Sequence, residues 1–100
     1  MVIGCCSINF YLHGNNSLKG KRRVVRAIKD RLKTDFNVSV AEIGNQDVWQ
    51  SLHIGICAVS SDKPYMDCLM AKVVDAIDRM NLAEIIDYKV EVLSMGSDNY

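Results

Sequence analysis

The segment with the most evident chemical potential is a run of basic side chains from Ser17 to Lys33, SLKGKRRVVRAIKDRLK. It holds eight of the twelve Lys and Arg residues of the 100-residue chain and one acid, Asp30. The charge from residue 19 to residue 33 is therefore +7, and the remaining four basic and eleven acidic residues carry −7. The net charge of zero conceals a strongly polarised molecule.

Clustered cations suit a polyanion, because each can neutralise a phosphate. At about 100° per residue, most of them fall on the side of a helix opposite the apolar stripe of Val25, Ile28 and Leu32. We predict that this face binds RNA or the ribosome without catalysing a reaction. The predicted nucleic-acid-binding residues are Lys19, Lys21, Arg22, Arg23, Arg26, Lys29 and Lys33. The alternative is a solvated helix whose long basic stems cover the edge of the core.

Residues suited to catalysis or metal binding are sparse. The cysteines are Cys5, Cys6, Cys57 and Cys68, and they include no C-x-x-C spacing. His13 and His53 have no recognisable nucleophile or metal partner. We therefore expect no catalytic residue, no cofactor and no metal site. We also expect the thiols to be reduced and mostly buried, with Cys68 as the candidate for exposure.

Hydrophobic periodicity predicts six elements in the order strand, helix, strand, strand, helix, strand. Their predicted ranges are 2–12, 18–35, 37–44, 51–61, 63–81 and 84–93, with Ser17 and Asp62 as N-caps. Right-handed crossovers would put both helices on one face of a four-stranded antiparallel sheet. The prediction is an α+β, ferredoxin-like βαββαβ sandwich over residues 1–94, with a frayed tail over 95–100.

The two faces of this sheet should differ. The helices should bury a set of apolar residues that comprises Val2, Ile8, Phe10, Val38, Val40, Ile54, Ile56, Val90 and Val92. The opposite face is also small and apolar, and it comprises Ile3, Cys5, Ser7, Ala41, Ile43, Gly55, Cys57 and Val59. A solvated sheet face would alternate with charged residues, so we predict a homo-oligomer that covers this open face.

The open face lacks the aromatic platform with which RNA-recognition motifs stack bases, and only Tyr11 and His13 are available for stacking. We therefore expect recognition of RNA backbone and shape. The connection between the second and third strands carries the only tryptophan. Asp47, Trp49 and Gln50 could bind a partner there. The favoured alternative is that Trp49 folds back as a lid over the end of the core.

Four segments carry a family resemblance: LHGNNSLKGKRRVVRAIKDRL, FNVSVAEIGNQDVWQ, IGICAVSSD and DYKVEVL. They resemble the YlxP-like family of small bacterial proteins of unknown function. The resemblance implies a ferredoxin-like fold and genes that lie near those for translation initiation, ribosome maturation and tRNA modification. It implies no activity. The family pattern has Glu where this chain has Gly20, so a capping box with Ser17 is incomplete.

Other classes of function are less well supported. The stretch HGNNSLKG leads into a helix N-terminus that could hold an anion, but it lacks the acylphosphatase loop pattern, and Arg22 and Arg23 lie more than a turn inside the helix. The alternative to RNA binding is a homo-oligomeric interaction domain or a regulatory, ACT-like domain that binds a small ligand, in either case with no nucleic-acid role. Domains of the ACT type share this topology, dimerise and use a Gly-containing turn after the first strand, which Gly14 could supply. No apolar run reaches the roughly 18 residues of a membrane span, and MVIGCCSINF has no basic leader. We expect a cytoplasmic location and no membrane partner.

Overall fold

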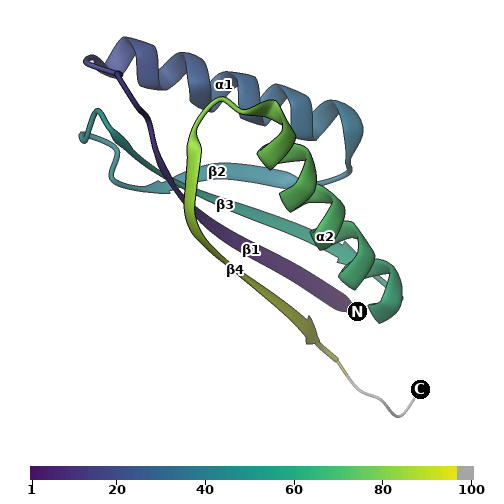
Figure 1. Ribbon diagram of the computed structural model, residues 1–100. Helices are drawn as coiled ribbons and strands as arrows, with labels where there is room; N and C mark the ends of the chain where they lie inside the picture. Colours follow the sequence, from purple (N-terminus) through teal and green to yellow (C-terminus); the bar gives the residue numbers. More distant parts are fainter. Residues whose placement is uncertain (97–100) are drawn as a thin grey trace.

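Four antiparallel strands form one sheet in the order β2-β3-β1-β4, in the computed structural model, which describes residues 1–96. The strands are β1 (Val2–Tyr11), β2 (Ser39–Gly44), β3 (Ser51–Ser60) and β4 (Glu84–Ser94). The helices α1 (Leu18–Asp35) and α2 (Lys63–Met80) both cover one face of the sheet (Figure 1). The predicted ferredoxin-like βαββαβ sandwich is confirmed.

The helix boundaries follow from their caps. Ser17 adopts extended backbone and its hydroxyl accepts the Gly20 N–H at 3.0 Å, which starts α1. Asp62 does the same for Tyr65 at 2.8 Å, and Pro64 suits the first turn of α2. The helix α2 ends at Met80 and is capped by Asn81, which takes the left-handed conformation with φ of 52°. Both predicted N-caps are confirmed.

The core lies between the helices and the sheet, and the register of the strands determines which residues belong to it. Cys6 pairs with Ile56 on one side and Val90 on the other, so all three face the helices. Gly4 lies on the same face, where a Cβ would come 2.4 Å from the Sδ of Met66. The absence of a side chain at Gly4 therefore lets α2 approach β1 closely.

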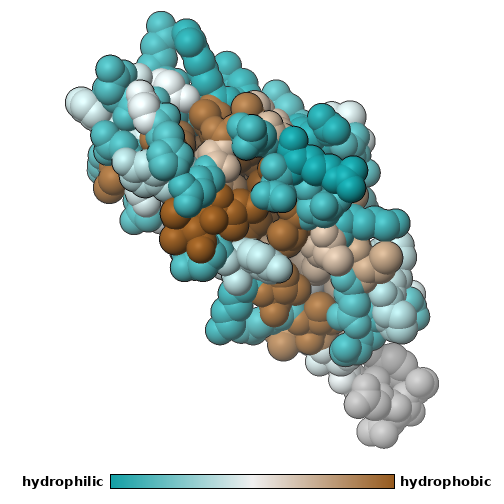
Figure 2. Space-filling model, viewed as in Figure 1, coloured by the Kyte–Doolittle hydropathy of each residue, from teal (hydrophilic) through white to brown (hydrophobic). Residues whose placement is uncertain are grey.

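The prediction that Val90 is buried is wrong, since 37% of it is exposed. Its side chain faces the helix layer, but α2 does not cover the edge strand β4 completely. A groove of about 650 Å³ remains between them, lined by residues that include Met70, Val74, Tyr88 and Val90. Figure 2 shows hydrophobic side chains reaching the surface along this part of the molecule.

The first residue pairs with the residue that follows β4. Met1 and Met95 exchange two backbone hydrogen bonds, with the Met1 nitrogen 3.1 Å from the Met95 oxygen and the Met95 nitrogen 2.7 Å from the Met1 oxygen. The sheet interactions thus continue one residue past β4. Most of the tail that was predicted to fray, residues 97–100, lies outside the described residues. Neither α1 nor α2 is long and apolar enough to cross a bilayer.

Candidate nucleic-acid interface

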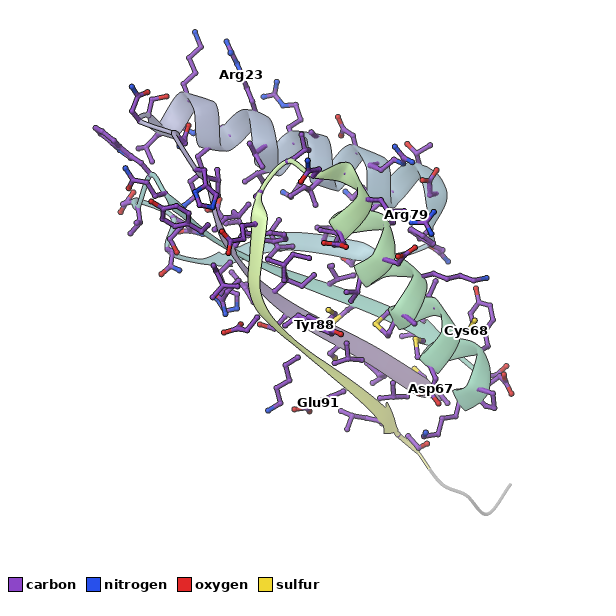
Figure 3. The ribbon with its side chains drawn as sticks, in the orientation of Figure 1. Arg23, Asp67, Cys68, Arg79, Tyr88 and Glu91 are labelled. Atoms are coloured by element: carbon purple, nitrogen blue, oxygen red, sulfur yellow. The ribbon has the colours of Figure 1, made fainter. Side chains whose placement is uncertain are left out.

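Six cations project from the outer side of α1, and we call them the cationic ridge. They are Lys19, Arg22, Arg23, Arg26, Lys29 and Lys33. All are exposed except Lys29, which is half-buried. Arg23 points away from the sheet into solvent (Figure 3). At 1.5 Å per residue, the ridge spans about 22 Å along the helix.

The cationic ridge is not neutralised within the part of the chain that the structure describes. Arg31, which flanks it, forms an ion pair with Asp35 at 2.7 Å. None of the six ridge residues lies within 4.0 Å of a carboxylate between residues 1 and 96. Like charges at helical spacing repel one another by a few tenths of a kcal/mol per pair, so this face does not stabilise the fold.

Lys21 does not belong to this surface, and its prediction as a nucleic-acid-binding residue is wrong. Only 2% of it is exposed. Its ammonium lies 3.0 Å from Glu42 Oε2 and donates hydrogen bonds to the backbone carbonyls of Asn45 and Val48. The spacing could have revealed this, because Lys21 stands four residues before Val25 in the apolar stripe and shares its side of the helix.

The buried ammonium holds the loop between β2 and β3 against the start of α1. Val48 O accepts from Lys21 at 2.9 Å, and Trp49 O accepts from the Asn15 amide at 2.6 Å. The hairpin end therefore lies beside the N-terminus of α1 (Figure 1). Lys21 is thus a positioning residue: it is almost completely buried, and it places the loop next to the ridge.

Trp49 is 46% exposed, so the favoured prediction of a lid over the core is wrong. Asp47 is also exposed, and Gln50 is half-buried with its carbonyl 2.8 Å from the Leu12 nitrogen. The loop thus presents an aromatic side chain at the same end of the molecule as Lys19. Aromatic rings at the surface can stack on nucleic-acid bases, which extends the chemistry of the interface beyond phosphate binding.

The start of α1 is adapted to Gly20. The Asn15 amide bridges Ser17 O at 2.9 Å and Trp49 O at 2.6 Å. A Cβ on Gly20 would come 2.2 Å from Asn15 Oδ1. In this chain, Asn15 therefore uses the space that the Glu of the family pattern would enter, and it ties the cap to the loop.

The open sheet face carries hydrogen-bonded polar groups among its apolar ones. Ser7 Oγ lies 2.6 Å from His53 Nε2, and the thiols of Cys5 and Cys57, which pair directly across β1 and β3, are 3.5 Å apart. Val59 is 64% exposed. Self-association through this face stays a prediction.

The prediction of mostly buried cysteines is wrong, since only Cys6 is buried, Cys5 is half-buried and both Cys57 and Cys68 are exposed. Exposure of Cys68 itself is confirmed. Burial raises the pKa of the Cys6 thiol to about 11. The hydrogen bond between the Cys5 and Cys57 thiols, and then burial, raise the pKa of Cys5. These shifts favour neutral thiols and do not favour nucleophilic ones.

The remaining candidates are engaged with one another. Tyr11 and His13 pack edge to face with ring centroids 4.6 Å apart, and the His13 ring also hydrogen-bonds the Glu84 carboxylate. Both rings remain at the surface. Among residues 1–96, no group of three or more His, Cys, Asp or Glu side chains is placed to hold a metal ion.

The fold and this interface define a ferredoxin-like α+β protein with a cationic first helix. Residues 3–90 match the family described as Protein of unknown function (DUF503), and the chain belongs to that family. It is 39% identical over 77 residues to the Uncharacterized protein YlxP of Bacillus subtilis (strain 168), a match that covers 77% of this chain and 84% of that protein. The predicted YlxP-like membership is confirmed.

Solved structures share the fold at low identity. The De novo designed protein Foldit4 is 16% identical with a TM-score of 0.53, and the match covers 95% of this chain and 98% of that one. A protein of Arabidopsis thaliana is 9% identical with a TM-score of 0.52, covering 98% and 99%. Likeness at these identities concerns the fold alone.

Proposed function

We propose that this protein is a non-catalytic module of the cytoplasm that binds structured RNA, free or in the ribosome, through the cationic ridge of α1. The observation that supports the proposal best is that six neighbouring cations on one helix face have no carboxylate partner within residues 1–96. Folding gains nothing from such a face, whereas a phosphate backbone would neutralise it and release counterions.

The loop between β2 and β3 supports the same role. Lys21 and Asn15 hold it at the start of α1, and Trp49 is exposed there. One base stacked on an exposed aromatic ring contributes about 1–3 kcal/mol without reading sequence. The ridge would follow the backbone, and Trp49 would bind an unpaired base in a loop or bulge. This combination favours structured RNA over a uniform duplex.

The proposal predicts a steep salt dependence. A fluorescein-labelled RNA hairpin with an unpaired loop is titrated with protein, and binding is followed by anisotropy between about 50 and about 200 mM salt. If all six ridge cations contact phosphates, log K should fall against log salt with a slope of about −4 to −5. Affinity that does not weaken over this range would contradict the proposal.

Two charge-reversed variants test the location of the RNA-binding site. Arg22→Glu/Arg26→Glu changes the ridge, and Lys63→Glu/Lys72→Glu makes the same change in net charge on exposed positions of α2. We expect the first to weaken RNA binding at least tenfold, with a slope reduced by about 2, and the second to change affinity by less than about threefold. Equal losses of RNA affinity in the two variants would contradict the ridge as the binding site. Absent RNA binding together with a thermal shift by a metabolite would favour the ACT-like alternative.

A further inference from the structure

The strand β4 is an uncovered edge of the sheet. It lies last in the order β2-β3-β1-β4 and is 11 residues long. Ile86 and Tyr88 are 56% and 55% exposed, and Val90 lines the groove beside α2. Tyr88 extends from β4 on this side of the molecule (Figure 3). An edge of this length is a template for a further strand.

The sequence of β4 is self-complementary in one antiparallel register. If a two-fold axis passes through Val90, this residue faces its own copy, Tyr88 faces Val92, and Lys89 faces Glu91. The side chains of Tyr88, Val90 and Val92 lie on the helix side of the sheet, and the charged side chains lie on the open side. On the helix side of the ladder, apolar residues then face apolar residues. On the open side, each cation faces an anion.

Neighbouring registers lose this match. An axis through Lys89 sets it against its own copy and Asp87 against Glu91, which places like charges opposite each other. An axis through Glu91 sets two carboxylates together. An axis through Tyr88 pairs Asp87 with Lys89, but it brings Ile86 into the ladder. The register of β4 on β1 shifts at that residue, between Asn9 and Phe10, so a regular ladder would stop there.

We propose that the protein forms a two-fold symmetric dimer in which β4 pairs antiparallel with β4 of a second copy, with Val90 on the axis. The sheet then has eight strands, and all four helices lie on one side of it. The groove of about 650 Å³ beside α2 meets its copy at the axis, where Tyr88 and Val90 are covered. This inference does not depend on RNA binding.

The dimer has a geometric consequence for the cationic ridge. The helix α1 packs against β2, at the other edge of the sheet from β4. Pairing at β4 therefore leaves both ridges free, at the two ends of one helix layer. A dimer through the open sheet face would instead place the ridges on opposite outer sides, because the helices cover the other face.

A cross-link tests the register. Val90→Cys is made in a Cys5→Ser/Cys57→Ser/Cys68→Ser background, which leaves only the buried Cys6. Directly opposed residues of an antiparallel pair have Cα atoms about 4.5 or 5.5 Å apart, within the range of a disulfide. Oxidised glutathione should convert two introduced thiols into one intermolecular disulfide and be reduced to two glutathione thiols. Val59→Cys in the same background reports on the open sheet face.

The expected result is a covalent dimer for Val90→Cys and none for Val59→Cys, together with a dimer mass for the unmodified protein in sedimentation equilibrium at micromolar concentration. A monomer mass would overturn the proposal. So would a dimer mass without the Val90→Cys cross-link, and a cross-link at Val59→Cys would then place the second copy on the open sheet face.

Charge reversal gives an independent test at exposed positions. Lys89→Glu and Glu91→Lys each convert two attractive cross-strand pairs of the dimer into repulsive ones. We expect each single variant to weaken dimerisation about tenfold. The double variant Lys89→Glu/Glu91→Lys restores opposite charges and should return the dissociation constant to within about threefold of the original. If the single variants left the dissociation constant of the dimer unchanged, the proposed register would be wrong.

Discussion

Lys21 and Arg22 are adjacent and carry the same charge, but their side chains lie in opposite environments. A step of about 100° around α1 turns Lys21 under the helix, toward Glu42 and two loop carbonyls, and turns Arg22 toward solvent. Desolvation of an ammonium is costly unless it is paired and hydrogen-bonded. Here it donates to two backbone carbonyls and lies 3.0 Å from Glu42 Oε2, a buried oxygen that accepts no hydrogen bond among the described residues. The buried cation therefore fixes the loop, and the exposed ones are available to a ligand.

Lys21→Met keeps most of the volume of the side chain and removes its charge. Glu42 and the carbonyls of Asn45 and Val48 would lose their partner, so we expect the free energy of unfolding to fall by about 2–3 kcal/mol. Urea denaturation measures this loss. The emission of Trp49 should also change in the folded state, because the loop that carries it is released.

Lys19→Met is the control, since Lys19 is exposed and has no ion pair within the described chain. It should change stability by less than about 0.5 kcal/mol. Glu42→Gln in the Lys21→Met background should recover about 1 kcal/mol, because it removes the carboxylate that was left without a cation. Equal stability of the Lys21→Met and Lys19→Met variants would show that the buried pair contributes nothing.

At the scale of helices and strands, hydrophobic periodicity predicts those properties that depend on the sequence of one segment alone. The spacing of Val25, Ile28 and Leu32 indicates α1, and Ser17 and Asp62 mark helix starts, because these are local properties. The bulge opposite Asn9 and the close contact of Gly4 with Met66 depend on how two elements meet, and periodicity within one strand carries no record of that.

In the candidate interface, too, local properties could be predicted from the sequence and contacts between elements could not. The exposed arc of the ridge follows from the helical spacing within one segment. Exposure of Trp49 does not, since it depends on which oxygens Lys21 and Asn15 reach in a loop about 30 residues away in the sequence. Partial exposure of Val90 likewise depends on how far α2 covers the edge strand β4.

Gly20→Ala tests how the start of α1 is built. In an exposed helix this change would stabilise by about 1 kcal/mol. Here a Cβ would displace the Asn15 amide, which bridges Ser17 O and Trp49 O. We expect the two effects to offset each other, so that Gly20→Ala changes the free energy of unfolding by less than about 0.5 kcal/mol. Urea denaturation again provides the measurement.

A double-mutant cycle separates the two effects. In an Asn15→Ala background the closest contact of the added Cβ is removed, and only Ser17 Oγ, at 3.3 Å, stays near it, so Gly20→Ala should now stabilise by up to about 1 kcal/mol. The difference between the two backgrounds measures the coupling between the residues. If Gly20→Ala stabilised equally in both, Asn15 would not occupy the position that its two hydrogen bonds indicate.

For the whole molecule, the distribution of charge matters more than its sum. Outside residues 19–33 the chain carries −7, and the net charge is zero, so overall attraction to a polyanion is weak. The ridge acts at short range instead, because charges more than about 8–10 Å apart are largely screened at physiological salt. A polyanion in contact with α1 would meet six cations, the exposed Asp30 and few of the distant acids.

Retention on immobilised heparin, a sulfated polyanion, tests this distribution without any assumption about RNA sequence. The unmodified protein should be retained at low salt despite its zero net charge, because the ridge can lie against the polymer. Arg22→Glu/Arg26→Glu should elute with the void, whereas Lys63→Glu/Lys72→Glu, with the same change in net charge, should remain bound. If both variants eluted equally early, retention would follow the total charge, and the ridge would have no separate role in polyanion binding.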